Sequence, residues 1–143
     1  CRLCAHHFQR PGRAVAEMFR VLVPGGRLVL IDIVAPELAE VDTFLNAVEL
    51  VRDPSHVRDH TLSQWRAMLG AVGFAVDEVR TWPMRIDFEA WLTRIGATEA
   101  AAAALRLMFV RATDEVRARM QIDPDRLDFT LTNALIGAHR MPG

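Results

Sequence analysis

The chain has 143 residues, of which 51% are hydrophobic and 24% charged, a composition typical of one globular domain and not of a disordered segment. Its 17 basic and 18 acidic residues give a net charge of −1, which excludes a strongly basic nucleic-acid-binding protein. No apolar run reaches the roughly 18 residues that a membrane-spanning helix needs, and no signal peptide opens the sequence. We therefore expect a single domain over residues 1–143, located in the cytoplasm.

The N-terminal part of the chain predicts a strand, a helix and a second strand. Residues 1–5 are mostly apolar and indicate the end of a strand, and apolar residues recur at helical spacing over residues 13–23. Pro24 and the two glycines that follow it end that helix. Residues 27–34 are apolar on both faces except at Asp32, which is typical of a strand inside a parallel sheet. Together the three segments predict a βαβ unit.

The rest of the chain continues to alternate helices with strands. We expect helices over residues 36–51, 61–73, 87–96 and 98–120, and strands over residues 74–82 and 129–139. Thr61 and Gln64 have the spacing of a capping box at the start of the second of these helices. The strand over residues 74–82 carries charged side chains, which suits a position near the edge of the sheet.

The two cysteines, Cys1 and Cys4, are too few for a disulfide framework. With His6 and His7 they suggest a zinc site, but zinc ligands at this spacing need a turn between the cysteines. In an extended segment, residues three positions apart point to opposite faces, so the thiols would not converge. We therefore expect buried structural cysteines and no metal site.

Polar residues stand at the ends of the two predicted N-terminal strands. Asp32 interrupts a buried strand near its carboxyl end, where ligands bind in open α/β sheets. A buried carboxylate must be paired or hydrogen-bonded, so Asp32 either serves a ligand site or caps the loop that follows it. His6 and His7 follow the first strand, and we expect them on the same rim of the sheet as Asp32.

Residues 52–60 contain two arginines, two aspartates and two histidines between predicted helices. Such a loop can position a substrate and accept a proton, with His56 as the general base and Arg52 and Arg58 as substrate-orienting residues. The alternative is a solvated loop with weak arginine–aspartate pairs. No G-x-G sequence occurs anywhere in the chain, so no glycine-rich loop is predicted to hold a nucleotide or cofactor.

The sequence nevertheless resembles a known family. Residues 4–8 and 14–32, and above all the joint Arg-Val-Leu-Val-Pro-Gly-Gly-Arg-Leu at residues 20–28, look like the second half of a class I S-adenosylmethionine-dependent methyltransferase. Residues 52–58 and 74–76 are similar to the small-molecule branch related to the ubiquinone and menaquinone C-methyltransferases.

The resemblance implies an α/β, Rossmann-like sheet with helices on both faces. This chain would supply strands four to seven, with the last strand antiparallel, and a helical cap insertion at about residues 85–120. The N-terminal strands of that sheet would be missing, together with the glycine-rich cofactor loop. The resemblance therefore implies that the chain is the C-terminal part of a methyltransferase domain. It implies S-adenosylmethionine as the cofactor of the complete enzyme, and it does not extend to cofactor binding by this chain alone.

The resemblance also implies which residues surround the reaction. Ala5, His6, His7 and Phe8 would border the sulfonium of S-adenosylmethionine, and His56 would be catalytic. Asp32, Arg52, Arg58 and Trp91 would bind a small-molecule methyl acceptor, with methylation at carbon, oxygen or nitrogen left open. The alternative function is a non-catalytic, truncated domain that forms a homodimer through an exposed sheet edge.

Overall fold

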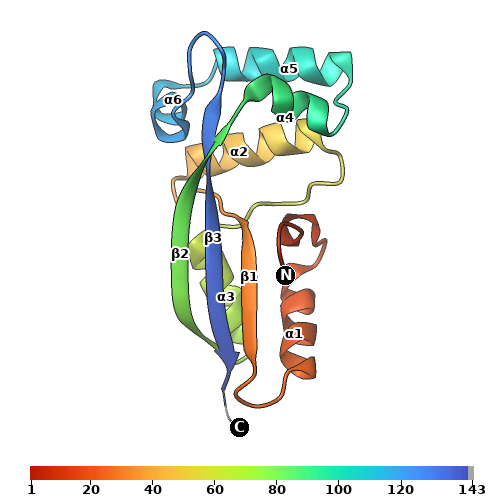
Figure 1. The fold of residues 1–143 in the computed structure, drawn as a ribbon, viewed down its shortest axis with the longest axis vertical. Coiled ribbons are helices and arrows are strands. Elements are labelled where there is room, and N and C mark those ends of the chain that lie inside the picture. Colours follow the sequence, from red (N-terminus) through yellow and green to blue (C-terminus); the bar gives the residue numbers. More distant parts are fainter. Residues whose placement is uncertain (142–143) are drawn as a thin grey trace.

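The computed structural model describes residues 1–141, so residues 142 and 143 of the predicted domain lie outside the described residues. The elements in chain order are η1 (Ala5–His7), α1 (Pro11–Val21), β1 (Arg27–Ile33), α2 (Ala39–Arg52), α3 (Leu62–Ala71), β2 (Phe74–Ile86), α4 (Phe88–Arg94), α5 (Glu99–Val110), α6 (Asp114–Met120) and β3 (Phe129–Arg140). Helices α1 and α3 flank one end of a long sheet, and α2, α4, α5 and α6 gather at the other end (Figure 1). None of the helices over residues 1–141 has the length and apolar character required to cross a bilayer.

The sheet has the strand order β1-β3-β2, and β3 is antiparallel to both neighbours. This confirms an antiparallel last strand and places the strand predicted near the edge, now β2, at an edge of the three-stranded sheet. The first residues run parallel to β1, because the Leu3 amide donates to the Ile31 carbonyl at 2.8 Å and the Ile31 amide donates to the Cys1 carbonyl at 2.9 Å. The predicted strand–helix–strand unit at the N-terminus therefore has its two extended segments side by side.

The predicted single helix over residues 98–120 is wrong. The structure has two helices there, α5 and α6, separated at residues 111–113. Thr113 causes the interruption, because its hydroxyl accepts a hydrogen bond from the Val116 amide at 3.3 Å and so begins a new helix. By contrast, the capping box of Thr61 and Gln64 is confirmed with both of its hydrogen bonds.

The interpretation of the cysteines is also wrong. The Sγ atoms of Cys1 and Cys4 lie 2.9 Å apart as free thiols, and Cys1 is exposed. The segment between them is not extended, because Leu3 has a φ of 50° and turns the chain. One non-glycine residue in the left-handed region is thus enough to bring the two thiols to the same side.

Two hydrophobic cores hold the helices on the sheet. The first lies beneath α1 and α3 and includes Val15, Leu30, Trp65, Leu69 and Ile136. The second lies between the far ends of β2 and β3 and the helices α2, α4, α5 and α6, and it includes Val41, Phe88, Trp91, Phe109 and Phe129. In the second core, the Phe109 ring lies 4.9 Å from both Phe88 and Phe129, centroid to centroid. The candidate site lies where elements of both cores meet.

Candidate functional site

A cavity of about 330 Å³ opens between η1, the end of β1, the end of α2, the loop after α2, β2 and α4. Its apolar wall consists of Leu3, Ile33, Met84, Ile86, Trp91 and Leu131. Its polar wall consists of His6, Glu49, Arg52, His56, Asp59 and Arg94. A pocket with one apolar wall and several converging titratable groups is the usual form of a small-molecule site.

Asp32 fastens the short helix η1 to the end of β1. Its Oδ2 accepts hydrogen bonds from the Ala5 amide at 2.7 Å and the His6 amide at 3.2 Å. Its Oδ1 accepts from the Ile33 amide at 2.9 Å and lies 2.7 Å from Nδ1 of His6. The carboxylate is 1% exposed, so these contacts replace the water that it loses on folding. Asp32 thus both caps the loop and orients a histidine.

The contact with Asp32 determines the state of the His6 ring. An ionised carboxylate only accepts hydrogen bonds, so Nδ1 of His6 carries a proton and Nε2 keeps a free lone pair. The hydrogen bond and charge of Asp32 raise the pKa of His6 above its ordinary value, against the opposing effect of burial. Burial raises the pKa of Asp32, but the hydrogen bond and charge of His6 outweigh it, so that pKa is lowered. His6 is therefore an oriented base on the cavity wall.

His56, the predicted general base, lies in the same cavity in a different environment. Its Nε2 is 3.2 Å from Oδ1 of Asn46 and donates to it, because the Asn46 amide nitrogen faces three oxygens, the carbonyl and Oδ1 of Asp42 and the carbonyl of Asp59. Burial and the nearby His6 and His7 lower the pKa of His56 to about 4. A base that weak stays neutral near pH 7 and gains little from accepting a proton.

Two buried carboxylates in the cavity escaped the sequence analysis. Glu49 is 4% exposed and lies 3.4 Å from Nε of Arg52, whose guanidinium stacks 4.7 Å above the Trp91 ring. Asp59 is 1% exposed, and neither of its carboxylate oxygens has a hydrogen-bond partner among the described residues. Glu49 could have been found, because it lies four residues after Leu45 on the apolar face of α2.

Among the predicted substrate-binding residues, Arg52 and Trp91 line the cavity, as does His56. Asp32 lies behind His6, and Arg58 forms an ion pair with Asp42 away from the cavity lining.

The four residues predicted to border the cofactor lie on η1 and just after it, and of these only His6 opens into the cavity. The Nδ1 atom of His7 lies 3.0 Å from the Ser55 carbonyl, and Ala5 and Phe8 pack in the first core. The same loop is held in place from the other side, because the His6 carbonyl accepts from the amides of Val57 and Arg58 at 2.9 and 3.0 Å.

A metal ion is a further possibility at this place, since one ligand atom each from His6, Asp32 and Asp59 lies within 4.8 Å of the others. However, Asp32 already accepts from three amides and the His6 ring, which fills its lone pairs. We therefore interpret the group as a hydrogen-bonded pair beside an unpartnered carboxylate.

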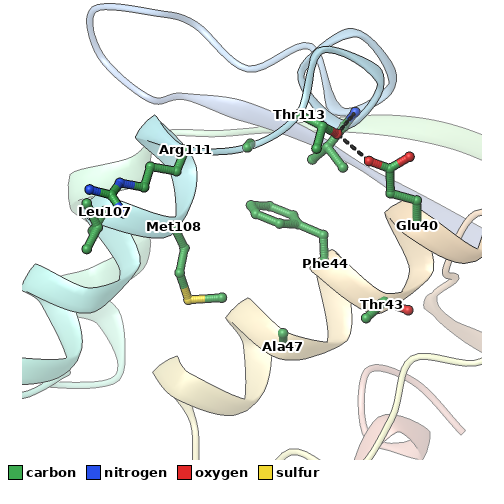
Figure 2. Close-up of a pocket in the computed structure, with 10 residues that line it drawn as sticks. Glu40, Thr43, Phe44, Ala47, Leu107, Met108, Arg111 and Thr113 are labelled. Atoms are coloured by element: carbon green, nitrogen blue, oxygen red, sulfur yellow. Dashed lines mark hydrogen bonds between the residues drawn. The ribbon is translucent and has the colours of Figure 1, made fainter.

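A second cavity, of about 480 Å³, lies between α2 and the helices α5 and α6 (Figure 2). Phe44, Ala47 and Met108 face one another across it, and its charged residues Glu40 and Arg111 are exposed. The Glu40 carboxylate accepts a hydrogen bond from the Thr113 hydroxyl at 2.5 Å. This cavity contains no buried group that could exchange a proton, so it is not the candidate active site.

The cofactor implied by the resemblance fits one side of the first cavity. His6 is held by two separate elements and presents a polar ring where a reacting methyl group would need a defined neighbour. A glycine-rich loop for the nucleoside does not occur in this sequence. The residues of this chain therefore suit the sulfonium end of S-adenosylmethionine, and the chain has no glycine-rich loop for the nucleoside.

Comparisons with known proteins bear on the same residues. A family model for a methyltransferase domain matches residues 1–30, which include η1. The uncharacterised methyltransferase YcgJ of Bacillus subtilis is 38% identical over 117 residues, or 82% of this chain and 46% of YcgJ. The uncharacterised protein YafE of Escherichia coli is 33% identical over 139 residues, or 97% of this chain and 67% of YafE.

Solved structures agree with the sequence comparisons. The crystal structure of YcgJ has a TM-score of 0.95 at 35% identity and covers 100% of this chain, which spans 63% of that one. A candidate methyltransferase from Bacillus halodurans has a TM-score of 0.95 at 34% identity, covering 99% of this chain and 68% of its own. The chain thus spans about half to two thirds of these relatives. It belongs to the class I S-adenosylmethionine-dependent methyltransferases, as its sequence predicted.

Proposed function

We propose that this chain forms the acceptor-binding side of an enzyme that transfers a methyl group from S-adenosylmethionine to a small molecule, with His6 as general base and Asp32 as its positioning residue. The observation that carries the proposal is the 2.7 Å contact between His6 Nδ1 and Asp32 Oδ1 on the wall of a mixed polar and apolar cavity. This pair replaces His56 as the favoured base, because the pKa of His56 is about 4 and that of His6 is raised.

The chain's residues then act in defined ways. S-adenosylmethionine, when bound, supplies an electrophilic methyl group. His6 Nε2 accepts the proton that the acceptor's hydroxyl loses, and Asp32 stabilises the resulting imidazolium. Trp91 and Ile33 contact the acceptor's carbon skeleton, and the ion-paired Arg52 holds the Trp91 face in place. Orientation of the acceptor against the methyl group contributes most of the rate gain.

The proposal extends to the intact protein. The parallel pairing of residues 1–3 with β1, followed by β3 and β2, is consistent with strands four to seven of the family's sheet. The chain covers only 46% of YcgJ, which supports an intact enzyme with further residues. The family resemblance implies that these would include the further strands and the glycine-rich cofactor loop. The branch related to quinone C-methyltransferases remains part of the proposal.

The test is a methyl-transfer assay of the intact enzyme with isotope-labelled S-adenosylmethionine and a panel of phenols, diols and amines. We expect label on at least one acceptor, a loss of roughly 10²–10⁴-fold in His6→Gln, and less than about tenfold in His56→Gln. Met108→Leu in the second cavity is the matched control and should leave the rate unchanged. Absence of transfer to every acceptor would favour the non-catalytic dimerising module instead. Transfer at an unchanged rate in His6→Gln would show that His6 is not the base.

A further inference from the structure

The carboxylate of Asp59 is a buried group of the cavity that the proposed mechanism does not use. Its side chain is 1% exposed, and both oxygens lack hydrogen-bond partners among the described residues. A buried acceptor without a donor destabilises the fold, so such a group points to a partner that arrives with a ligand.

The position of Asp59 is fixed by its own backbone. Its amide donates to Oδ1 of Asn46 at 2.7 Å, and its carbonyl accepts from Nδ2 of Asn46 at 3.2 Å. Asn46 lies in the middle of α2, so the loop cannot swing the carboxylate into solvent without breaking both bonds. The hydrogen bonds to Asn46 therefore fix the backbone of Asp59 beside the cavity.

The two neighbouring carboxylates already have partners, although Nε of Arg52 makes no hydrogen bond of its own within residues 1–141. Asp32 is engaged by the His6 ring and three backbone amides, and Glu49 lies beside Arg52. A ring nitrogen of His6 and a carboxylate oxygen of Asp59 lie within 4.8 Å of each other. Two hydroxyls on adjacent carbon atoms have a spacing that allows one to contact the His6 ring and the other the Asp59 carboxylate, each through a hydrogen bond of about 2.8 Å.

On the basis of the proposed function, we infer that Asp59 binds a second hydroxyl of the acceptor, next to the hydroxyl that His6 deprotonates. The acceptor is then a vicinal diol or a catechol, whose carbon skeleton lies against Ile33, Trp91 and Leu131. An amine is the competing acceptor, because Arg52 and Arg94 would repel its ammonium group while the carboxylates of the same cavity would attract it. The experiment therefore includes an amine as a probe.

The experiment measures binding of probes by calorimetry, without the methyl donor. Catechol, phenol and benzylamine are compared on the wild-type protein, on Asp59→Ala and Asp59→Asn, and on Asp125→Ala as an exposed control. We expect catechol to bind about tenfold more tightly than phenol to the wild type, the gain from one additional hydrogen bond to a charged or polar partner. In Asp59→Ala that preference disappears, and in Asp125→Ala it remains.

Asp59→Asn keeps one accepting oxygen and the side-chain volume, so it should retain part of the preference and also serves if the alanine variant does not fold. Equal affinities of catechol and phenol for the wild type, or an unchanged preference in both Asp59 variants, overturn the inference. So does tighter binding of benzylamine that depends on Asp59. Because binding is measured without transfer, a catechol preference with no methylation contradicts the proposed function and leaves the role of Asp59 standing.

Discussion

The two cavities of this molecule differ in chemistry more than in size. The first, of about 330 Å³, holds the buried carboxylates of Glu49 and Asp59 beside the half-buried ring of His6. The second, of about 480 Å³, has a mostly apolar lining, and its charged residues are exposed. Burying a charged group costs several kcal/mol of folding free energy unless it is paired. Buried ionisable side chains are therefore found preferentially at functional sites. The comparison supports the proposal that the smaller, polar cavity is the active site and that the apolar one contributes to packing.

The largest expected effect comes from removing the carboxylate that organises the polar cavity. Asp32→Ala leaves the Ala5 amide, the His6 ring and the Ile33 amide without their partner. Breaking a buried pair in this way costs about 3–5 kcal/mol of unfolding free energy, measurable by urea denaturation. A decrease of less than about 1 kcal/mol in the free energy of unfolding would show that water satisfies the donors that contact Asp32 in the wild type. The hydrogen bonds of Asp32 would then not distinguish the polar cavity from the apolar one in stability.

A smaller change at the same residue tests the base. Asp32→Asn keeps an acceptor for η1 but removes the negative charge, so the imidazolium of His6 is less stable and the pKa of His6 falls. In the wild type, activity should rise with pH through an apparent pKa above the ordinary histidine value of about 6.5. In Asp32→Asn this rise should move to lower pH, while the maximal rate drops about 10–100-fold.

The pH dependence of the rate separates this role of Asp32 from mere stabilisation. A purely structural role would lower the amount of active enzyme and leave the apparent pKa in place. The measurement is therefore a pH–rate profile of both proteins with the best acceptor of the panel.

In the apolar cavity the expected effect is on stability alone. Phe44 packs edge-to-face on Phe109 at 5.4 Å and is partly buried, so Phe44→Ala should cost about 1–3 kcal/mol, less than a fully buried phenylalanine. The turnover of the folded enzyme should not change, as measured below the melting temperature. A fall in turnover of more than about tenfold would make this cavity part of the active site and break the comparison.

The smallest effect concerns Asp59, and its sign is a gain. Burial, followed by the charge of Glu49, raises the pKa of Asp59 well above its ordinary value. The protonated form is therefore favoured in the folded state, and this contribution to stability is lost as pH rises from the unfolded pKa, about 3.9, through the folded one. At pH 7 the free energy of unfolding of Asp59→Asn should be about 1 kcal/mol higher than that of the wild type. In denaturation curves this difference should shrink toward pH 4. An equal advantage at both pH values would mean that Asp59 is ionised throughout.

Local rules were sufficient for much of the fold. The capping box at Thr61, the cap at Asp87, the antiparallel last strand and the burial of Asp32 all follow from hydrogen-bonding needs or apolar patterns within a few residues. The position of His6 and Asp32 on the same rim of the sheet also follows, because the ends of neighbouring parallel strands meet at one edge, whereas their 2.7 Å contact was not predicted.

Other features depended on partners distant in sequence. Three such features arise only when α2 packs beside the loop that follows it. They are the ion pair of Arg58 with Asp42, the burial that lowers the pKa of His56, and the lack of a hydrogen-bond partner for the Asp59 carboxylate among the described residues. The apolar pattern of the sequence determined that the chain combines helices and strands, but not where every strand ends, since β2 continues to Ile86, beyond the strand predicted over residues 74–82. The tertiary structure decided which histidine we propose as the base, because a pKa depends on the charges and water around a side chain, and these are fixed only when separate elements pack together.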